Sequence, residues 1–224
     1  MLHGVSLAAA PGEIIALVGQ SGSGKTTLLR LVNHMLSPDS GEVRVGGRNV
    51  TQWDEIALRR QTGYAIQDVG LFPHFTVAEN VALLPRLLAW SPSRTTARVD
   101  ELLQLVGLPA DFRHRWPDEL SGGQRQRVGL ARALAADPPI LLMDEPFGAL
   151  DPITRSELHR EFRRLHETIP RTVLLVTHDL AEAFALANRV GVLHEGRLLA
   201  CDTPQALGES QHPYVRTLIE TRFG

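Results

Sequence analysis

The chain has 224 residues, of which 43% are hydrophobic and 21% charged, and its net charge is -2. This balance is typical of a globular protein of one sizeable domain, and it gives no electrostatic case for binding nucleic acid or an anionic membrane surface. No apolar run approaches the ~20 residues that span a bilayer, and the start lacks the charged and apolar regions of a secretory signal. The lone Cys201 excludes an internal disulfide and fits a reducing cytosol.

A phosphate-loop pattern lies near the start of the chain. Residues 14–18 are an apolar run that predicts a buried strand, and residues 27–32 predict a helix. Between them the pattern G-x-x-x-x-G-K-[ST] is matched by Gly19, Gln20, Ser21, Gly22, Ser23, Gly24, Lys25 and Thr26. In this setting the glycines let the backbone approach a phosphate, and the helix start directs N–H groups toward it. We therefore expect Lys25 to bind the β- and γ-phosphates of a nucleotide and Thr26 to ligate Mg²⁺.

Lys25 is the only lysine among the 23 basic residues. A sequence that otherwise uses arginine favours a compact ammonium at this one position. The same fact argues against a small P-loop GTPase, because the guanine-recognition motif Asn-Lys-x-Asp would need a second lysine.

Short strands precede and follow this loop. Residues 5–8 and 42–45 predict strands, the second of which closes a hairpin through a Gly-Gly turn. Residues 63–67 predict another buried strand, and Gln67 stands at its carboxyl end. Because ligands of open α/β sheets bind at that end of the strands, Gln67 is a candidate site residue.

The pattern then becomes helical. Residues 69–75 are an apolar loop broken by proline, and Thr76 and Glu79 have the spacing of a helix-capping box. Helical periodicity dominates residues 77–88 and 95–106. Strand patterns return at residues 140–143, 172–176 and 190–193. We therefore predict a single α/β domain over residues 1–224, with a P-loop core of mostly parallel sheet and a small N-terminal antiparallel β part in residues 1–68 and 137–224, and an inserted α-helical subdomain in residues 69–136.

Two carboxylates, Asp144 and Glu145, end the apolar strand at residues 140–143. Asp144 is expected to hold Mg²⁺, usually through its water shell. Glu145 stands where a carboxylate could polarise a water behind the γ-phosphate. Alone this pattern is weak evidence, and it gains weight because the phosphate loop requires a metal ligand on a neighbouring strand.

Residues 120–124 read Leu-Ser-Gly-Gly-Gln and precede a predicted helix. Ser121 and Gln124 have capping-box spacing, but a simple cap does not explain two glycines, which weaken a first helical turn. Bare backbone at a helix start suits a second anion site. Since one phosphate loop already holds the nucleotide, this second site suggests a nucleotide bound by another copy of the chain.

Taken in order, these motifs resemble the nucleotide-binding subunit of an ABC transporter, and the LSGGQ stretch is highly specific to that family. The likeness covers essentially the whole chain. It rests on the phosphate loop, Gln67, residues 120–124, Asp144, Glu145, residues 149–151 and His178.

The resemblance implies a role for each matching residue. The phosphate loop and Thr27 would bind ATP, and Gln67 would contact Mg²⁺ or the attacking water. Glu145 would be the general base, and His178 would contact the γ-phosphate and position Glu145 and water. In a head-to-tail dimer, the γ-phosphate held by a second copy would be gripped by Ser121, Gly122 and Gly123, followed by Gln124, and Asp151 would link the two sites.

The family usually stacks adenine on an aromatic residue about two dozen positions before the phosphate loop, and here that position falls before Met1. Either the chain starts too late, or other contacts hold adenine. Because base stacking contributes about 1–3 kcal/mol, we expect weak ATP affinity, which nanomolar binding would contradict.

The likeness also implies partners. Transmembrane permease subunits would hold the protein at the cytoplasmic face of the cell membrane, and an extracytoplasmic solute-binding protein would act indirectly. Residues 69–75 are the expected docking surface, since an exposed apolar patch is otherwise a liability; the alternative is that they pack within the helical subdomain.

Residues 70–74, 79–80, 87–90 and 147–155 are similar to those of importers of quaternary-amine osmoprotectants such as glycine betaine, carnitine, choline or proline betaine. Many of those proteins carry regulatory domains after the ATPase core, which we do not expect here. The alternatives are an importer of another small solute, such as an amino acid, and a soluble ABC-type ATPase, although the latter usually has two cassettes or coiled-coil insertions. A kinase would leave the LSGGQ stretch unexplained.

Overall fold

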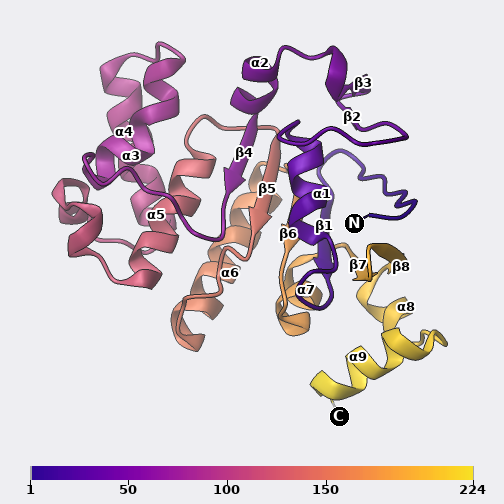
Figure 1. Cartoon of the computed structure of the whole chain (residues 1–224). Coiled ribbons are helices and arrows are strands. Elements are labelled where there is room, and N and C mark those ends of the chain that lie inside the picture. Colours follow the sequence, from indigo (N-terminus) through magenta and orange to yellow (C-terminus); the bar gives the residue numbers. More distant parts are fainter. Residues whose placement is uncertain (1, 224) are drawn as a thin grey trace. The chain divides into compact units, whose positions relative to one another are not determined.

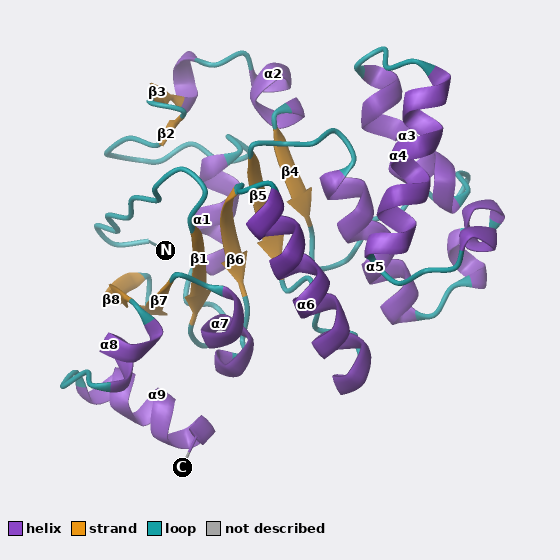
Figure 2. Cartoon of the chain, turned by 180° about the vertical axis from the view of Figure 1, so that it is seen from behind, coloured by secondary structure: helices purple, strands orange, loops and turns teal. Residues whose placement is uncertain are grey.

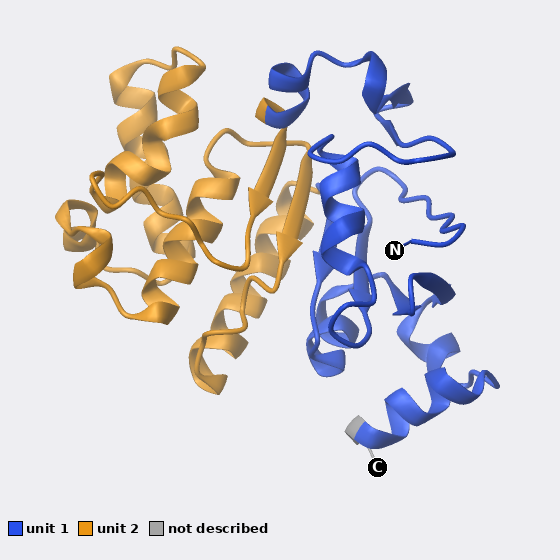
Figure 3. Ribbon diagram, in the orientation of Figure 1, with its two compact units in different colours: residues 1–59, 171–224 blue, residues 60–170 orange. Residues whose placement is uncertain are grey.

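Strand β1 (Ile14–Val18) lies inside the first of two compact units into which the chain divides. The computed structural model describes residues 2–223, so Met1 and Gly224, the ends of the predicted domain, lie outside the described residues. Unit 1 comprises residues 1–59 and 171–224, and unit 2 comprises residues 60–170 (Figure 3). The predicted division into a core and a helical insertion at residues 69–136 stays a prediction.

Unit 1 is built on a sheet with β1 in its interior. Strand β1 pairs in parallel with β6 (Thr172–Val176) and with β7 (Arg189–His194), and β8 (Arg197–Asp202) is the antiparallel partner of β7. All five residues of β1 are buried, as expected for a strand with neighbours on both sides. Helices α1 (Lys25–Val32) and α7 (Leu180–Leu186) lie on opposite faces of this sheet (Figures 1 and 2).

The remaining elements of unit 1 are short. The predicted hairpin is present as an antiparallel pair, which confirms the small N-terminal antiparallel part. These elements are β2 (Arg44–Val45), β3 (Arg48–Asn49), η1 (Val50–Gln52), α2 (Glu55–Arg60), which runs to the unit boundary, α8 (Pro204–Gly208) and α9 (Pro213–Phe223).

The strand predicted at residues 5–8 is wrong, because no strand is assigned before β1 in the described chain. Only two of its side chains, Val5 and Leu7, are half-buried, and exposed alanines follow them. So little buried apolar surface gives this segment small driving force to join a sheet.

Unit 2 pairs two parallel strands with a group of helices. Strand β4 (Thr62–Ala65) aligns with β5 (Ile140–Asp144), and α3, α4 and α5 pack against one another. The helices are α3 (Val77–Leu87), α4 (Pro92–Leu105), η2 (Ala110–His114), η3 (Pro117–Glu119), α5 (Gly122–Leu134) and α6 (Pro152–Thr168). The α/β class with mostly parallel strand pairing is therefore confirmed.

Close packing fixes α5 within unit 2. A Cβ atom on Gly63 of β4 would overlap the carbonyl oxygen of Ala133, so glycine lets the strand lie directly on the helix. At the end of α5, the buried guanidinium of Arg98 donates to the carbonyl oxygens of Leu134 at 2.9 Å and Ala135 at 3.3 Å. These bonds satisfy carbonyls that a helix end would otherwise leave without partners.

None of the helices within residues 2–223 is both long enough and apolar enough to cross a bilayer.

Candidate nucleotide-binding and hydrolysis site

The loop between β1 and α1 closes around the ammonium group of Lys25. Its Nζ lies 2.8 Å from the carbonyl oxygens of Gly19 and Gln20 and 3.3 Å from Ser23 Oγ. The Lys25 residue is only 7% exposed. The loop therefore holds one positive charge among its own acceptors, at the place where the sequence predicts phosphate binding.

Two glycines of this loop are required by its geometry. Gly19 has a φ of 149°, and a Cβ there would overlap the carbonyl oxygen of Leu193 in β7. Gly24 is the N-cap of α1 in the left-handed conformation, and this cap position makes no side-chain hydrogen bond to the helix start. The helix thus begins without the side-chain oxygen that would compete with an anion for its first N–H groups.

His178 lies at the same end of the unit 1 sheet as the phosphate loop. It directly follows Thr177, whose N–H donates to Leu17 O at 3.1 Å next to the end of β6. Because β1 and β6 are parallel neighbours, the segments that follow them leave the sheet at one edge. Unit 1 therefore brings together the phosphate loop, Thr26, Thr27 and the exposed His178.

Unit 2 brings together Gln67, just beyond the end of β4, with Asp144 and Glu145, the last residue of β5 and the one that follows it. Gln67 Nε2 donates to Glu145 Oε2 at 3.4 Å. Asp144 is 3% exposed at the end of β5. Glu145 has a φ of 49°, which is uncommon for a residue other than glycine and marks a conformation that its surroundings must hold.

The start of α5 forms the predicted capping box. Ser121 Oγ accepts from Gln124 N at 3.2 Å, and Gln124 Oε1 accepts from Ser121 N at 2.8 Å. In the first turn, Gly122 has open space where a Cβ would stand, apart from an Arg125 nitrogen at 4.0 Å, whereas a Cβ on Gly123 would come within 3.2 Å of Ala149 O. The second glycine therefore lets the helix start lie against the loop that follows β5.

Asp151 caps helix α6. Its Oδ1 accepts from Ile153 N at 3.1 Å and from Thr154 N at 3.0 Å. Hydrogen bonds from Thr154, its side chain first, lower the pKa of Asp151 below the usual carboxyl value. Asp151 is therefore anionic at neutral pH and fixes the end of the loop that begins at Glu145.

Sequence reasoning missed Gln126, the second polar residue after the LSGGQ stretch. It is 7% exposed. Its amide nitrogen donates to Glu145 O and its amide oxygen accepts from Ala149 N, so it joins α5 to the loop of residues 145–150, called here the Glu145 loop. A signal was present, because Gln126 stands one helical turn before the buried Leu130, where the 3.6-residue period predicts an apolar side chain.

The side chains predicted to bind Mg²⁺ carry oxygen ligands, one of them in unit 1 and two in unit 2. Within residues 2–223 no cluster of three or more histidine, cysteine or acidic side chains could hold a metal. Magnesium does not need one, since proteins usually bind it through one or two carboxylates, waters and substrate phosphates. The buried carboxylate of Asp144 and the oxygens of Thr26 and Gln67 are hard ligands of the required kind.

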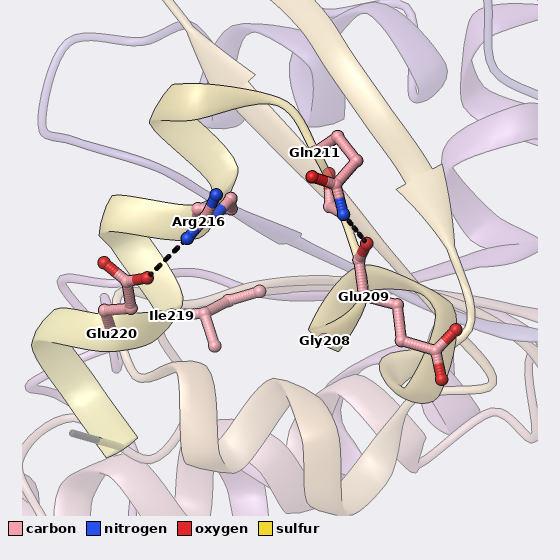
Figure 4. Close-up of a pocket in the computed structure, with 7 residues that line it drawn as sticks. Gly208, Glu209, Gln211, Arg216, Ile219 and Glu220 are labelled. Carbon is pink, nitrogen blue, oxygen red and sulfur yellow. Dashed lines mark hydrogen bonds and ion pairs between the residues drawn. The ribbon is translucent and has the colours of Figure 1, made fainter.

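A polar pocket between α8 and α9 lies apart from these residues in the sequence (Figure 4). Arg216 and Glu220 form an ion pair at 3.4 Å on one side of it, and Gln211 Nε2 donates to Glu209 O at 3.2 Å on the other. None of the residues that line it belongs to the predicted site.

Comparison with known proteins places these features in a wider context. Residues 2–148 match the family model described as ABC transporter. The chain is 46% identical, over 92% of its length and 54% of the relative's, to the glycine betaine/carnitine/choline transport ATP-binding protein OpuCA of Bacillus subtilis strain 168. It is 50% identical, over 86% of its length and 63% of the relative's, to the glycine betaine uptake system ATP-binding protein YehX of Escherichia coli K12. The chain thus spans 54% and 63% of the lengths of these two relatives.

A solved structure is also similar over most of the chain. The dimeric ATP-binding cassette MJ0796, in a post-hydrolysis state bound to ADP and Pi, matches with a TM-score of 0.84 and 34% identity, covering 90% of each chain.

Proposed function

The chain belongs to the ABC transporter family, and from that premise we propose that it is the ATP-binding and ATP-hydrolysing subunit of an importer. The observation that carries the ATPase part is the loop closed around Lys25, followed by a helix whose N-cap is a glycine. The proposed solute class, quaternary-amine osmoprotectants such as glycine betaine, carnitine or choline, is supported by likeness to OpuCA and YehX. An importer of another small solute is the alternative.

The phosphate loop would bind the phosphates of ATP. Lys25 supplies the charge, and the backbone of residues 19–24 with Thr27 supplies N–H donors. Thr26, Gln67 and Asp144 would be the protein ligands of Mg²⁺. When bound, the metal would offset the negative charge that develops on the transferred phosphoryl group.

Glu145 would act as the general base for the attacking water. Its carboxylate is approached by the Gln67 amide at 3.4 Å, a contact that helps to orient the carboxylate for proton transfer from water. His178 would contact the γ-phosphate and help to position the water. These assignments use side chains of the two types, carboxylate and imidazole, that most often move protons in enzymes.

A second copy of the chain would complete each site in a head-to-tail dimer. Ser121, Gly122, Gly123 and Gln124 would grip the γ-phosphate bound by the partner copy, and Asp151 would link the two sites. Two-fold symmetry then gives two equivalent sites from one kind of contact. Likeness to a dimeric cassette supports this arrangement.

The permease would dock on residues 69–75. Buried Asn80 shapes this segment, since its Oδ1 accepts from Phe72 N at 2.8 Å and its Nδ2 donates to Phe75 O at 3.1 Å. Arg132 of α5 donates to the carbonyls of Val69 and Gly70. Phe72 nevertheless stays 40% exposed. A rigid segment that presents an aromatic ring suits a protein partner, which would hold the chain at the cytoplasmic face of the membrane, with a solute-binding protein acting indirectly.

The ATPase proposal is tested with Glu145→Gln. Loss of a general base typically lowers turnover ~10²–10⁴-fold, and the amide should also leave an ATP-stabilised dimer. Turnover is measured by phosphate release and the dimer by size-exclusion chromatography with ATP. Hydrolysis at the wild-type rate would show that Glu145 is not the base, and absence of hydrolysis by the wild-type chain would reject the ATPase proposal itself.

The docking and solute proposals are tested after reconstitution with the permease in liposomes. Phe72→Ala should uncouple ATP hydrolysis from uptake while the isolated subunit keeps its ATPase rate. Hydrogen exchange at residues 69–75 should slow when the permease is present, and unchanged exchange would reject the docking surface. Uptake of labelled glycine betaine, carnitine and choline, compared with labelled amino acids, decides the solute class.

A further inference from the structure

A single buried side chain connects helix α5 to the loop that carries Glu145. The amide nitrogen of Gln126 donates to the carbonyl oxygen of Glu145 at 2.7 Å. The amide oxygen of the same side chain accepts from the N–H of Ala149 at 2.8 Å. At 7% exposed, Gln126 makes both hydrogen bonds where water competes little.

Glu145 needs such support because its backbone lies in the left-handed region. A side-chain-bearing residue stays there only where its surroundings hold it. Gly148 N also donates to Glu145 O, at 3.3 Å, but it belongs to the same loop and cannot tie that loop to another element. Gln126 comes from outside the loop and makes the shorter of these two bonds.

The start of α5 contacts the same loop a second time. Gly123 packs so closely on it that an added Cβ would come within 3.2 Å of Ala149 O and of Leu150 Cδ2. Ala149 is therefore held on both sides, by Gln126 at its N–H and by Gly123 at its carbonyl oxygen. A displacement of the α5 start cannot leave the Glu145 loop where it is without breaking one of these contacts.

We propose that Gln126 is a positioning residue for Glu145, and that it transmits the position of the α5 start, residues 121–124, to the backbone of the general base. Gln67 approaches the carboxylate of Glu145 and Gln126 bonds to its backbone carbonyl oxygen, so the two glutamines together hold the side chain and the backbone of Glu145. The inference rests on the proposed role of Glu145 in ATP hydrolysis. Its consequence is that the residues that grip the partner copy's phosphate also set the geometry of hydrolysis in their own chain.

Two variants separate the two hydrogen bonds. Gln126→Met removes both while keeping side-chain length, and Gln126→Glu keeps the acceptor for Ala149 N but places a carboxylate against the Glu145 carbonyl oxygen. Gln104→Met, on the exposed side of α4, is the matched control. We expect Gln126→Met to lower kcat about 10- to 100-fold, as lost hydrogen bonds in catalytic positioning do, with the KM for ATP changed less than about twofold.

A pH profile distinguishes positioning from general destabilisation. In Gln126→Glu the introduced carboxyl can donate to Glu145 O only when protonated, so its kcat relative to wild type should rise as the pH is lowered from 8 to 6. Gln126→Met has no group to protonate, and its ratio to wild type should stay flat. A parallel fall of kcat and stability in both variants, with no difference in pH response, would overturn the proposal.

Hydrogen exchange gives a readout that does not depend on hydrolysis. The Ala149 amide should exchange faster in Gln126→Met than in wild type and in Gln104→Met, measured on folded protein without nucleotide. If the wild-type chain does not hydrolyse ATP, the proposed function fails while this measurement still decides whether Gln126 holds the loop. If wild type hydrolyses ATP and Gln126→Met does so at the same rate, the positioning role is rejected and the proposed function stands.

Discussion

Two helix starts in this chain are built in opposite ways. Helix α1 begins at Gly24, with no side-chain cap in the described structure, and carries the ammonium of Lys25 beside it. Helix α5 begins at Ser121 inside a complete capping box, in which Ser121 and Gln124 satisfy each other's backbone N–H groups. The N-cap of the first start has no side-chain acceptor, whereas the second start already pairs the N–H groups of Ser121 and Gln124 with its own side chains.

The positively charged side chains near the two helix starts also have different partners. Lys25 is held at the loop by three oxygen acceptors. At α5 the nearest basic residue, Arg125, has its Nη1 on the carbonyl oxygen of Leu120, at 2.5 Å. The start of α1 therefore has a positive charge fixed within its own loop, whereas the charge beside α5 is bonded to the carbonyl oxygen that precedes that helix.

The largest effect, on the free energy of unfolding, should come from Gly19→Ala, which changes the loop that precedes α1. The added Cβ would overlap the Leu193 carbonyl, and a clash between backbone segments has no flexible side chain to relieve it. We expect a loss of more than ~3 kcal/mol in the free energy of unfolding, in the tail of single-substitution effects. Urea unfolding measures it.

Gly41→Ala is the control for this clash, because Gly41 also has a positive φ, 82°, but has nothing within 4 Å of an added Cβ. It should cost only the left-handed backbone penalty, ~1–2 kcal/mol. Equal losses in the two variants would show that the close approach to Leu193 does not require glycine.

Lys25→Met should have the next largest effect, on binding. It keeps the length of the side chain and removes the charge. A hydrogen bond to a charged group is worth about 1.5–3 kcal/mol, so the Kd for ATP should rise about 10- to 100-fold in equilibrium titration with a fluorescent ATP analogue. Lys25→Arg should not restore affinity, since a planar fork cannot meet the Gly19 and Gln20 carbonyls as a compact ammonium does. Wild-type affinity in Lys25→Arg would contradict this.

A smaller effect is expected from Ser121→Ala at the second start. Loss of a serine N-cap costs ~1 kcal/mol, and the free energy of unfolding from urea titration should fall by that amount while ATP binding to the isolated chain is unchanged. Ser91→Ala removes the matching cap of α4, where Ser91 Oγ accepts from Arg94 N at 3.3 Å. Both variants should lose similar stability, and only Ser121→Ala should weaken ATP-dependent dimerisation. Equal dimerisation in both would contradict a role for this start in binding the partner's phosphate.

Local rules were enough to predict both helix starts. The phosphate loop, the Ser121 and Gln124 box and the strand at residues 172–176 follow from spacing within a few residues, and the structure confirms their local conformation. Helix α6 escaped prediction because it buries only Leu158 and Phe162 and therefore has little apolar periodicity. Its cue was the Asp151 cap followed by proline at the first helical position.

Long-range support could not be predicted in the same way. Gln126 and Glu145 are 19 residues apart, and no pattern in either segment predicts that the two residues are in contact. The left-handed backbone of Glu145 is likewise a product of its partners rather than of its own preference. The roles of the site residues remain predictions, for which the structure supplies the geometry within each unit.

The smallest effect should come from Thr76→Val, which tests whether a capping box outside the site behaves like the one at Ser121. The Thr76 hydroxyl donates to Glu79 Oε2 at 3.0 Å, and the Thr76 backbone N–H does so at 2.8 Å. The backbone bond first, and then the hydroxyl bond, lower the pKa of Glu79 below its usual value. A lowered carboxyl pKa gives stability that is present above the usual pKa and is lost as the pH falls through the folded value.

Valine keeps the shape of Thr76 and the backbone bond but removes the hydroxyl, so the pKa of Glu79 should move only part of the way back. At neutral pH the variant should be less stable than wild type, by no more than the ~1 kcal/mol of a typical cap. The difference should shrink as the pH falls below the usual carboxyl pKa and through the lowered pKa of Glu79, because the protonated side chain loses these bonds. Urea unfolding of both proteins between pH 7 and pH 3 measures this, and a difference that stays constant over that range would mean that the Thr76 hydroxyl does not act through Glu79.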